Sequence, residues 1–323
     1  MTDWRPSSGP AAAARRAALL GRVRDYFAAA GVLEVDTPAL STCAVSDVQI
    51  ESFGIDGSAI SKCPLYLHTS PEFCMKRLLA AGYPDIYSIA RVFRDGEAGH
   101  SHQPEFTMIE WYRLGMGLDE IVGDTVQLIS QALADNVPLA TPVRLDYRDV
   151  VHEVTGQDLH TIDVAILADA VDADTELRAA LGSNKDDWLD LLLATHVVPT
   201  FRKDRLTVLQ HYPASQAALA RLCPGNPDVA DRFEVFFGPV ELANGYVELT
   251  DAAEQSVRIA ADNKERQQRG RPVRPVDDAL IAALESGLPD CAGVAMGLER
   301  LQMISDKTEH IRDVITFEFE QHA

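Results

Sequence analysis

Hydrophobic and polar positions follow a helical period near the start of the chain. Residues 11–30 are rich in alanine, with Leu19, Val23 and Phe27 on one side of a helical repeat and Gly31 after its end. Apolar residues at this spacing form one buried face, and glycine commonly ends a helix because it tolerates a left-handed backbone. The pattern therefore predicts a helix over residues 11–30.

The period then shortens to two, which predicts a strand. Residues 32–38 alternate apolar and acidic side chains until Pro38, which has no amide hydrogen to donate to a sheet. A second helix is predicted further along. Pro71 suits its first position, Glu72 places an acid in its first turn, and Gly82 closes it.

The rest of the chain gives elements of both kinds. Further strands are predicted at 86–94, 106–113, 232–238 and 241–250, further helices at 118–135, 252–269 and 277–287, and a strand that leads into a helix at 293–303. Residues 140–230 have a less distinctive pattern, which favours several helical pieces. We therefore expect an α+β fold with a loose leader at 1–13 and a single domain at 14–323, which contains a helical insertion around 150–230.

Composition narrows the function. The 323 residues include 29 Lys and Arg against 49 Asp and Glu, a net charge of −20. A field of that sign repels a phosphate backbone, and no basic cluster is large enough to offset it, so tight binding to nucleic acid is not expected. No signal peptide and no stretch of bilayer-spanning apolar length is evident, which predicts a cytoplasmic protein.

The five cysteines are scattered along the chain, at Cys43, Cys63, Cys74, Cys223 and Cys291. Their number is odd and no two of them form a C-x-x-C pair, so we expect neither a disulfide framework nor a zinc site. Reduced, mostly buried thiols are the simplest expectation.

One predicted strand carries residues that are unusual for a core. A period of two places Phe106, Met108, Glu110 and Tyr112 on one face of the strand at 106–113. An acid and a phenol beside apolar neighbours cost desolvation unless both have partners. From the residues alone, a half-solvated sheet face and a functional site are equally open interpretations.

Several ordered segments resemble the class II aminoacyl-tRNA synthetases, in particular the lysyl branch. Residues 93–113, which begin Phe-Arg and contain Pro-Glu-Phe-Thr-Met-Ile-Glu-Trp-Tyr, are similar to motif 2. Residues 32–38, with the helix before them, resemble motif 1, and residues 293–301 resemble motif 3. With the segments 70–72 and 241–249, the resemblance covers the chain from about residue 14 onward.

The resemblance implies a catalytic core made of a mostly antiparallel sheet flanked by helices. In that family the carboxylate of an amino acid attacks the α-phosphate of ATP and expels pyrophosphate, which depends mainly on positioning and charge stabilisation. By resemblance, Arg94 and Arg300 are the catalytic residues, at the α-phosphate and at the γ-phosphate end. The residues expected around ATP are Arg94, Asp95, Gly96, Glu97, His102, Gln103, Phe106, Glu241, Leu242, Gly297 and Arg300.

The resemblance also implies a pocket for an amino acid with an ammonium group at each end. Glu72 is expected to bind the α-amino group, although an acid in a first helical turn also stabilises the helix dipole. Glu110, Tyr112 and Glu248 are expected to bind the distant ammonium. The residues expected around the amino acid are Ser70, Pro71, Glu72, Glu110, Tyr112, Asn244, Glu248 and Ala295. Glu241 and Glu248 are expected to hold Mg²⁺, which prefers hard oxygen ligands.

The sequence departs from the lysyl pattern at a few positions. Gly96 stands where relatives carry an acid that meets the adenine amino group, so either Glu97 substitutes for it or a backbone group makes that contact. Gln103 replaces the usual Asn, and Glu299 replaces a common Asp. Ala295 stands where lysyl-tRNA synthetases have glycine, and the added methyl group argues against ordinary α-lysine as the substrate.

The motif 1 segment begins too early for an anticodon-binding domain to precede it, so tRNA is not the expected acceptor. Residues 211–216 and 241–245 resemble the elongation factor P lysyltransferases, truncated relatives that transfer lysine or (R)-β-lysine to a lysine side chain of elongation factor P. We therefore expect elongation factor P as the partner, no membrane partner and, by the motif 1 analogy, a homodimer. Two alternatives stay open: an enzyme that acylates a small molecule or tRNA, and a catalytically silent paralogue that only binds its ligand.

Overall fold

An eight-stranded sheet forms the centre of the protein. The computed structural model describes residues 4–57, 59–134 and 136–319. From edge to edge the strands are β1 (Leu33–Glu34), β5 (Ile86–Phe93), β6 (Glu105–Leu114), β13 (Cys291–Gly297), β12 (Val240–Val247), β11 (Arg232–Phe237), β8 (Arg205–Gln210) and β7 (Ala140–Asp146). Neighbouring strands are antiparallel except for the edge pairs β1–β5 and β7–β8, which are parallel. The predicted α+β class with a mostly antiparallel sheet is confirmed.

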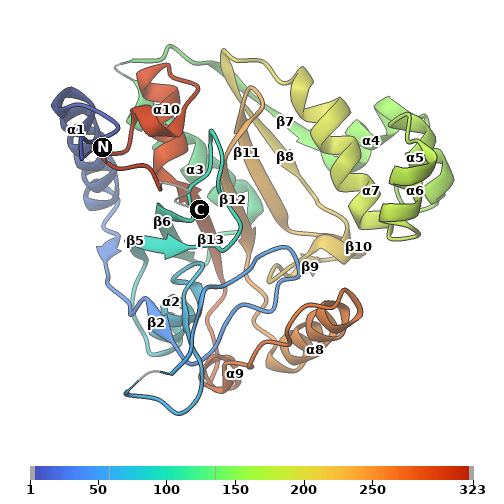
Figure 1. Cartoon of the computed structure of the whole chain (residues 1–323), viewed down its shortest axis with the longest axis horizontal. Coiled ribbons are helices and arrows are strands. Elements are labelled where there is room, and N and C mark those ends of the chain that lie inside the picture. The colour runs from blue at the N-terminus through green and yellow to red at the C-terminus, as the bar shows by residue number, and fades with distance from the viewer. Residues whose placement is uncertain (1–3, 58, 135, 320–323) are drawn as a thin grey trace.

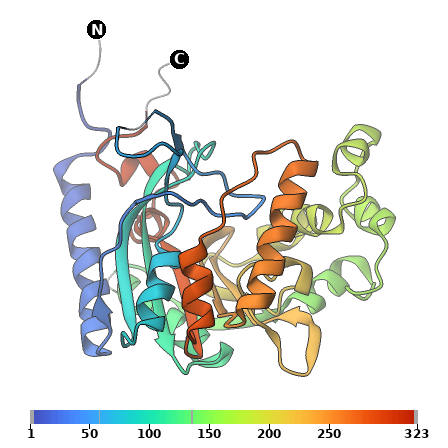
Figure 2. The ribbon, with the colours of Figure 1, turned by 90° about the horizontal axis from the view of Figure 1, so that it is seen from below.

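Helices cover both faces of this sheet (Figures 1 and 2). One face carries α1 (Pro10–Ala29), α3 (Leu118–Leu133) and α10 (Leu298–Asp306), and the other carries α2 (Glu72–Ala80) and α9 (Asp278–Glu285), with α8 (Ala252–Gln268) beside α9. The alternation of β6 divides its side chains between the two layers. Trp111 is buried against α1 and α3, whereas its neighbour Tyr112 is buried on the α2 side.

The layer of α1 fixes the edge of the sheet. Phe27 stacks on Tyr87 of β5 with ring centroids 4.2 Å apart. Arg16 of α1 donates to Thr107 of β6 at 2.6 Å and to Glu299 of α10 at 2.8 Å. Glu299 also accepts from the backbone amide of Thr107 at 3.0 Å. These contacts fix the start of α10 relative to β6.

A lobe of short helices projects from the β7–β8 edge (Figure 1). It consists of α4 (Tyr147–Thr155), α5 (Val164–Ala170), α6 (Thr175–Leu181), α7 (Lys185–Leu192), a π-helical turn (Leu193–Val197) and a 3₁₀ turn (Val198–Thr200). Each α-helix begins at an Asp or Asn whose side chain accepts from a backbone amide, at Asp146, Asp163, Asp174 and Asn184. The lobe has its own apolar core, which includes Trp188 and reaches Phe236 of β11.

Small strands shape the loops around the central sheet. β2 (Leu40–Ser41), β4 (Leu65–Leu67) and β3 (Gly54–Ile55) form a three-stranded sheet, and β9 (Leu222–Cys223) pairs with β10 (Asn226–Ala230) in a hairpin. Two further 3₁₀ turns are Ala214–Gln216 and Ile311–Asp313. Across the residues that the structure describes, no helix is both long and apolar enough to cross a membrane.

Most predicted elements are present, with two corrections. The strand expected at 32–38 is reduced to the two residues of β1, because beyond them the chain leaves the edge of the sheet. The region 140–230 is not only helical, since β7 and β8 lie in it and form the far edge of the sheet. All residues of β7 are exposed or half-buried. A strand of that kind leaves little periodic signal in the sequence.

Candidate active site

A cavity of about 1720 Å³ opens on the α2 side of the sheet. Its walls come from β6, β11, β12 and β13, with α2, the loop after β5 and the first turn of α10 around its rim. Pockets for one small ligand are commonly about 300–1,000 Å³. The cavity therefore has room for two ligands side by side.

One end of the cavity is lined by three acids that surround a buried lysine behind them. We call these four residues the carboxylate end: Glu72, Lys76, Glu110 and Glu248. The Lys76 ammonium lies 2.6 Å from Glu72 Oε1 and 2.5 Å from Glu248 Oε2. The side chains of Lys76 and Glu248 are 1% and 0% exposed, so this pairing lies in the protein interior. Three acids against one lysine leave an excess of negative charge when all are ionised.

Hydroxyl groups hold the acids of the carboxylate end in place. Ser70 donates to Glu110 at 2.6 Å, and Tyr112 donates to the other oxygen of Glu110 at 2.8 Å. Tyr246 donates to Glu72 at 2.8 Å. Ser70 also accepts from the amide of Glu72 at 2.9 Å, which ties the start of α2 to β6. These acids are oriented before any ligand arrives.

The electrostatics of the carboxylate end favour a positively charged ligand. Burial, reinforced by the charge of Glu72, raises the pKa of Glu110 to about 8. Burial also raises the pKa of Glu248 to about 8, although the attraction of Lys76 opposes it. For Lys76 burial lowers the pKa, but the attraction of Glu248 and Glu72 outweighs burial and the net shift is upward. Lys76 thus stays charged, and an additional ammonium would stabilise the ionised acids.

A glycine makes the close packing of the carboxylate end possible. In the register of β13 with β6, Gly293 faces Tyr112 and Ala295 faces Glu110. A β-carbon at Gly293 would lie 2.4 Å from a Glu248 oxygen and 2.5 Å from the Tyr112 ring, closer than such atoms can approach. Only glycine at this position lets Glu248 and Tyr112 approach β13 as they do.

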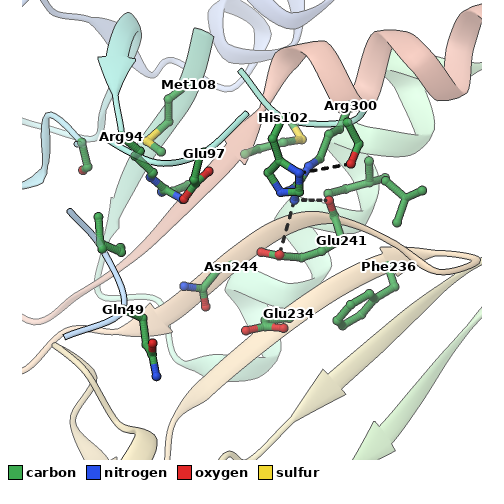
Figure 3. Close-up of a pocket in the computed structure, with 18 of the residues that line it drawn as sticks. Gln49, Arg94, Glu97, His102, Met108, Glu234, Phe236, Glu241, Asn244 and Arg300 are labelled. Carbon is green, nitrogen blue, oxygen red and sulfur yellow. Dashed lines mark hydrogen bonds and ion pairs between the residues drawn. The ribbon is translucent and has the colours of Figure 1, made fainter. Parts of the chain in front are cut away.

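The other end of the cavity is lined by two arginines with a histidine and an acid, and we call it the arginine end: Arg94, His102, Glu241 and Arg300. An Arg300 nitrogen lies 2.5 Å from His102 Nε2, and another lies 3.1 Å from the Glu241 carbonyl and 3.4 Å from its carboxylate (Figure 3). Burial and the Arg300 charge lower the pKa of His102, so its ring is neutral and can accept from Arg300.

Arg94 faces the same cavity from the loop after β5 (Figure 3). Its guanidinium lies 5.2 Å from the centre of the Phe106 ring and 3.5 Å from Glu97. Its Nε is buried without a hydrogen-bond partner. A planar guanidinium with free donors is suited to a phosphate or carboxylate.

Glu241 of the arginine end has a second carboxylate, Glu234, near it on the adjacent strand. Glu234 of β11 pairs in register with Asn244, and Phe236 with Glu241, so both acids face the cavity from neighbouring strands (Figure 3). Burial and then the Glu241 charge raise the pKa of Glu234 to about 7. Arg232 donates to Glu234 at 2.8 Å and lies 4.5 Å from the Tyr212 ring centre.

The expected metal pair of Glu241 and Glu248 is not brought together. The strand between them is roughly 20 Å long at about 3.3 Å per residue. Glu248 is held by Lys76 in the carboxylate end, whereas Glu241 lies with Arg300 in the arginine end. The acid that the structure places near Glu241 is Glu234.

Most residues expected around ATP and the amino acid line this one cavity. They are Ser70, Glu72, Arg94, Glu97, His102, Gln103, Phe106, Glu110, Tyr112, Glu241, Leu242, Asn244, Glu248, Ala295, Gly297 and Arg300. Pro71, Asp95 and Gly96 do not line it. Pro71 caps α2. The amide of Asp95 donates to the Glu51 carbonyl at 2.8 Å, and Gly96 forms a turn with φ of +84°.

That turn brings Glu97 into the cavity. Glu97 lines the cavity, so its carboxylate is within the same space as the other expected ATP-binding residues. Gln103 is buried and its side-chain oxygen accepts from the amide of Phe319 at 2.7 Å, so it holds the C-terminal segment beside the cavity.

Four residues of the site were not found from the sequence: Lys76, Arg232, Glu234 and Tyr246. Lys76 lies one turn after Glu72, and a lysine on the buried face of a helix is the available signal. Glu234 and Tyr246 follow the period of two along their strands, as Glu110 does on β6. Arg232 lies two residues before Glu234 on β11, so its side chain is on the same face of the sheet.

Comparison with known proteins identifies the family. Residues 2–321 match the tRNA synthetases class II (D, K and N). The chain is 41% identical over 323 residues to the elongation factor P–(R)-β-lysine ligase of Sodalis glossinidius, covering 99% of this chain and 98% of that protein. It is 41% identical over 319 residues to the ligases of the same name from Photorhabdus laumondii and Yersinia pestis, covering 98% of this chain and 97% of each relative. The resemblance seen in the sequence is confirmed: the chain belongs to the elongation factor P–(R)-β-lysine ligase family of class II synthetase-like ligases.

Proposed function

We propose that this protein activates a lysine-like amino acid with ATP and transfers it to a lysine side chain of elongation factor P. The observation that carries the proposal is a single cavity with two chemically opposite ends. An amino acid with two ammonium groups is complementary to the carboxylate end. A nucleotide triphosphate is complementary to the guanidinium groups of the arginine end.

The reaction has two steps. First, a carboxylate oxygen of the amino acid bonds to the α-phosphorus of ATP, and the bond to pyrophosphate breaks with its electron pair on the leaving group. Second, the neutral amine of the acceptor lysine attacks the carbonyl carbon of the adenylate, AMP leaves, and the amine loses a proton. Both steps need alignment and stabilisation of negative charge more than covalent help from the protein.

The residues of the arginine end fit these needs. We assign Arg94 to the α-phosphate and the attacking carboxylate, and its buried, unpartnered Nε in the cavity wall supports this role. Arg300 would bind the far phosphates in place of its contacts with His102 and Glu241. Phe106 offers a ring face on which adenine can stack. We assign Glu97, which lines the same cavity, to the adenine amino group.

We propose Glu234 and Glu241, rather than Glu241 and Glu248, as the ligands of a divalent cation such as Mg²⁺. Their hard oxygens suit that ion. Burial and then the Glu241 charge raise the pKa of Glu234, and a bound cation would offset both effects. When bound, the ion would neutralise charge on the phosphates. Glu248 then serves the amino acid alone.

Ala295 supports (R)-β-lysine over lysine as the acyl donor. Its methyl group faces Glu110 across the β13–β6 register and lines the cavity. Moving the amino group by one carbon shifts the ammonium relative to the carboxylate, so a site with fixed acids can distinguish the two isomers. A difference of one methyl group is commonly worth about 1–3 kcal/mol of discrimination.

Elongation factor P is proposed as the acceptor because the similar proteins of three bacteria are named for it. The net charge of −20 supports a protein acceptor over tRNA. A small-molecule acceptor remains the alternative to test. The retained Arg94 and Arg300 disfavour a catalytically silent protein.

We also propose a cytoplasmic homodimer with a single catalytic domain. This domain begins before the expected boundary at residue 14, because residues 10–13 belong to α1 rather than to a loose leader. Leu33 and Leu40, which flank the motif 1 proline, are 46% and 40% exposed. Exposed apolar residues of this kind can be covered by a second copy of the chain. Light scattering of the purified protein would test the dimer, and a mass of one chain would exclude it.

The test of function is ATP–pyrophosphate exchange followed by acyl transfer. We expect exchange with (R)-β-lysine, weaker exchange with lysine, and a mass increase of one acyl group on co-expressed elongation factor P. Replacement of the acceptor lysine of elongation factor P by Arg should abolish that increase. Exchange without transfer to elongation factor P would point to another acceptor, and absence of exchange with either donor would refute the proposal.

A further inference from the structure

Three side chains of kinds that can bind a metal ion converge next to Tyr212 and Arg232 of the cavity wall. His211 follows β8, Cys223 ends β9, and Asp231 joins β10 to β11. A ring nitrogen of His211, the sulfur of Cys223 and a carboxylate oxygen of Asp231 all lie within 4.8 Å of one another. The Cys223 sulfur is 2.9 Å from Asp231 Oδ1. Tetrahedral zinc ligands lie about 2.0–2.3 Å from the ion and therefore roughly 3–4 Å apart, so small side-chain shifts would complete such a site.

Two of the three side chains already have outer partners of the kind found in metal sites. His211 Nδ1 is 2.7 Å from Asp146 Oδ2, which leaves Nε2 as the nitrogen with a lone pair for a metal. Arg221 donates to Asp231 Oδ2 at 2.8 Å and leaves Oδ1 towards Cys223. Carboxylates that orient ligating histidines, and hydrogen bonds to ligating carboxylates, are regular outer-shell features.

The backbone holds the ligand segments in register. The amide of His211 donates to Arg232 at 3.0 Å, and the amide of Asp231 donates to Arg221 at 3.0 Å. Asp146 is itself fixed, because its other carboxylate oxygen accepts from the amide of Arg148 at the start of α4. The ligands therefore come from rigid positions, as a selective metal site requires.

We propose that His211, Cys223 and Asp231 bind one zinc ion, with the fourth position facing solvent. A thiolate and an imidazole favour zinc over magnesium, so this site is chemically distinct from the pair Glu234 and Glu241. Zinc would tie the β9–β10 hairpin to the sheet directly beside Tyr212 and Arg232 of the cavity wall. The absence of a C-x-x-C pair does not exclude it, because its ligands come from three separate segments.

Zinc binding by the purified full-length protein is the first measurement, by competition with a chromophoric chelator and by elemental analysis after dialysis. We expect one zinc ion per chain, and its loss in Cys223→Ser. Serine is similar in size and keeps the hydrogen bond to Asp231. In the presence of a strong chelator, the free energy of unfolding should therefore be the same for the wild-type protein and for Cys223→Ser. The exposed Cys63→Ser is the matched control and should keep the zinc.

Two further variants test whether the zinc ion is held by these three side chains or elsewhere on the protein. Asp146→Asn should weaken zinc binding about 10- to 100-fold, the usual effect of losing an outer partner. Glu234→Gln should leave it unchanged. Cobalt in place of zinc should give a thiolate charge-transfer band that Cys223→Ser lacks. No zinc on the wild-type chain, or equal zinc on Cys223→Ser, would overturn the proposal, and neither result depends on the acyl-transfer activity.

Discussion

The carboxylate end and the arginine end lie in one cavity but differ in how far their charged side chains are exposed to solvent. Lys76 and Glu248 are almost without solvent, whereas the side chains of Arg300 and Glu241 are 24% and 41% exposed. Charges in a dry interior interact several times more strongly than charges near water. The carboxylate end is therefore part of the fold as well as of the site, and the arginine end can rearrange around a ligand without disturbing the fold.

The largest expected effect tests whether the carboxylate end supports the fold. Lys76→Met would leave buried acids without their cation, and breaking a buried pair of this kind costs about 3–5 kcal/mol. We expect that loss in the free energy of unfolding, measured with denaturant. Arg91→Met, which removes the exposed pair with Glu105, is the control and should cost less than about 1 kcal/mol. Equal free energies of unfolding for the two variants would show that the carboxylate end does not support the fold.

The next effect tests whether the arginine end acts in chemistry alone. Arg300→Lys keeps the charge but loses the planar pair of donors, and we expect the rate of ATP–pyrophosphate exchange to fall about 100- to 1,000-fold. The unfolding free energy should change by less than about 1 kcal/mol, because the side chain is partly exposed. A variant that loses stability along with activity would place Arg300 in the fold instead.

A smaller effect is expected when one acid is neutralised without changing its shape. Glu110→Gln keeps one hydrogen-bond acceptor for Ser70 or Tyr112 but cannot carry charge. A hydrogen bond to a charged group is worth about 1.5–3 kcal/mol, so KM for the diamino acid should rise roughly 10- to 100-fold. KM for ATP should stay within about threefold. If both constants rise together, the two ends are coupled and the comparison must be revised.

The smallest effect is a pH dependence confined to the carboxylate end. Burial raises the pKa of Glu110 and of Glu248 to about 8, so below that pH these acids hold protons that a bound ammonium must displace. If binding releases one proton, affinity for the amino acid should rise by at most about tenfold from pH 7 to pH 8, while affinity for ATP changes less. Stability of the free protein should run the other way, falling as pH rises towards 8. Calorimetry in two buffers of different ionisation heat would detect the released protons, and Glu110→Gln should release fewer.

The fold could be predicted where the sequence repeats a clear period. The helix at 11–30 and the strands at 86–94 and 106–113 agree with α1, β5 and β6 within a few residues. β7 lacked such a signal, because an edge strand with few buried side chains does not need alternating residues. Its place beside β8 is decided by tertiary packing of the helical lobe, which no local pattern contains.

The site could be predicted where its residues lie in one continuous segment. Glu110 and Tyr112 on β6 are of this kind, and the resemblance placed Arg94 and Arg300 in the same cavity. The choice of Glu248 over Glu234 as a partner of Glu241 failed to anticipate the structure, because proximity across β11 and β12 depends on the register of two strands. Lys76 was missed for a related reason: its role depends on an acid from β12 that is far away in the sequence.

Two positions of β13 that face the cavity differ in whether they can accommodate a side chain. At Gly293 even a single carbon would collide with Glu248 and Tyr112, whereas Ala295 already carries one beside Glu110. Of these two positions, only residue 295 can therefore be substituted, in nature or by design, to change the acyl donor. We therefore expect residue 295 to vary among family members that use different acyl donors, and residue 293 to be glycine in all of them.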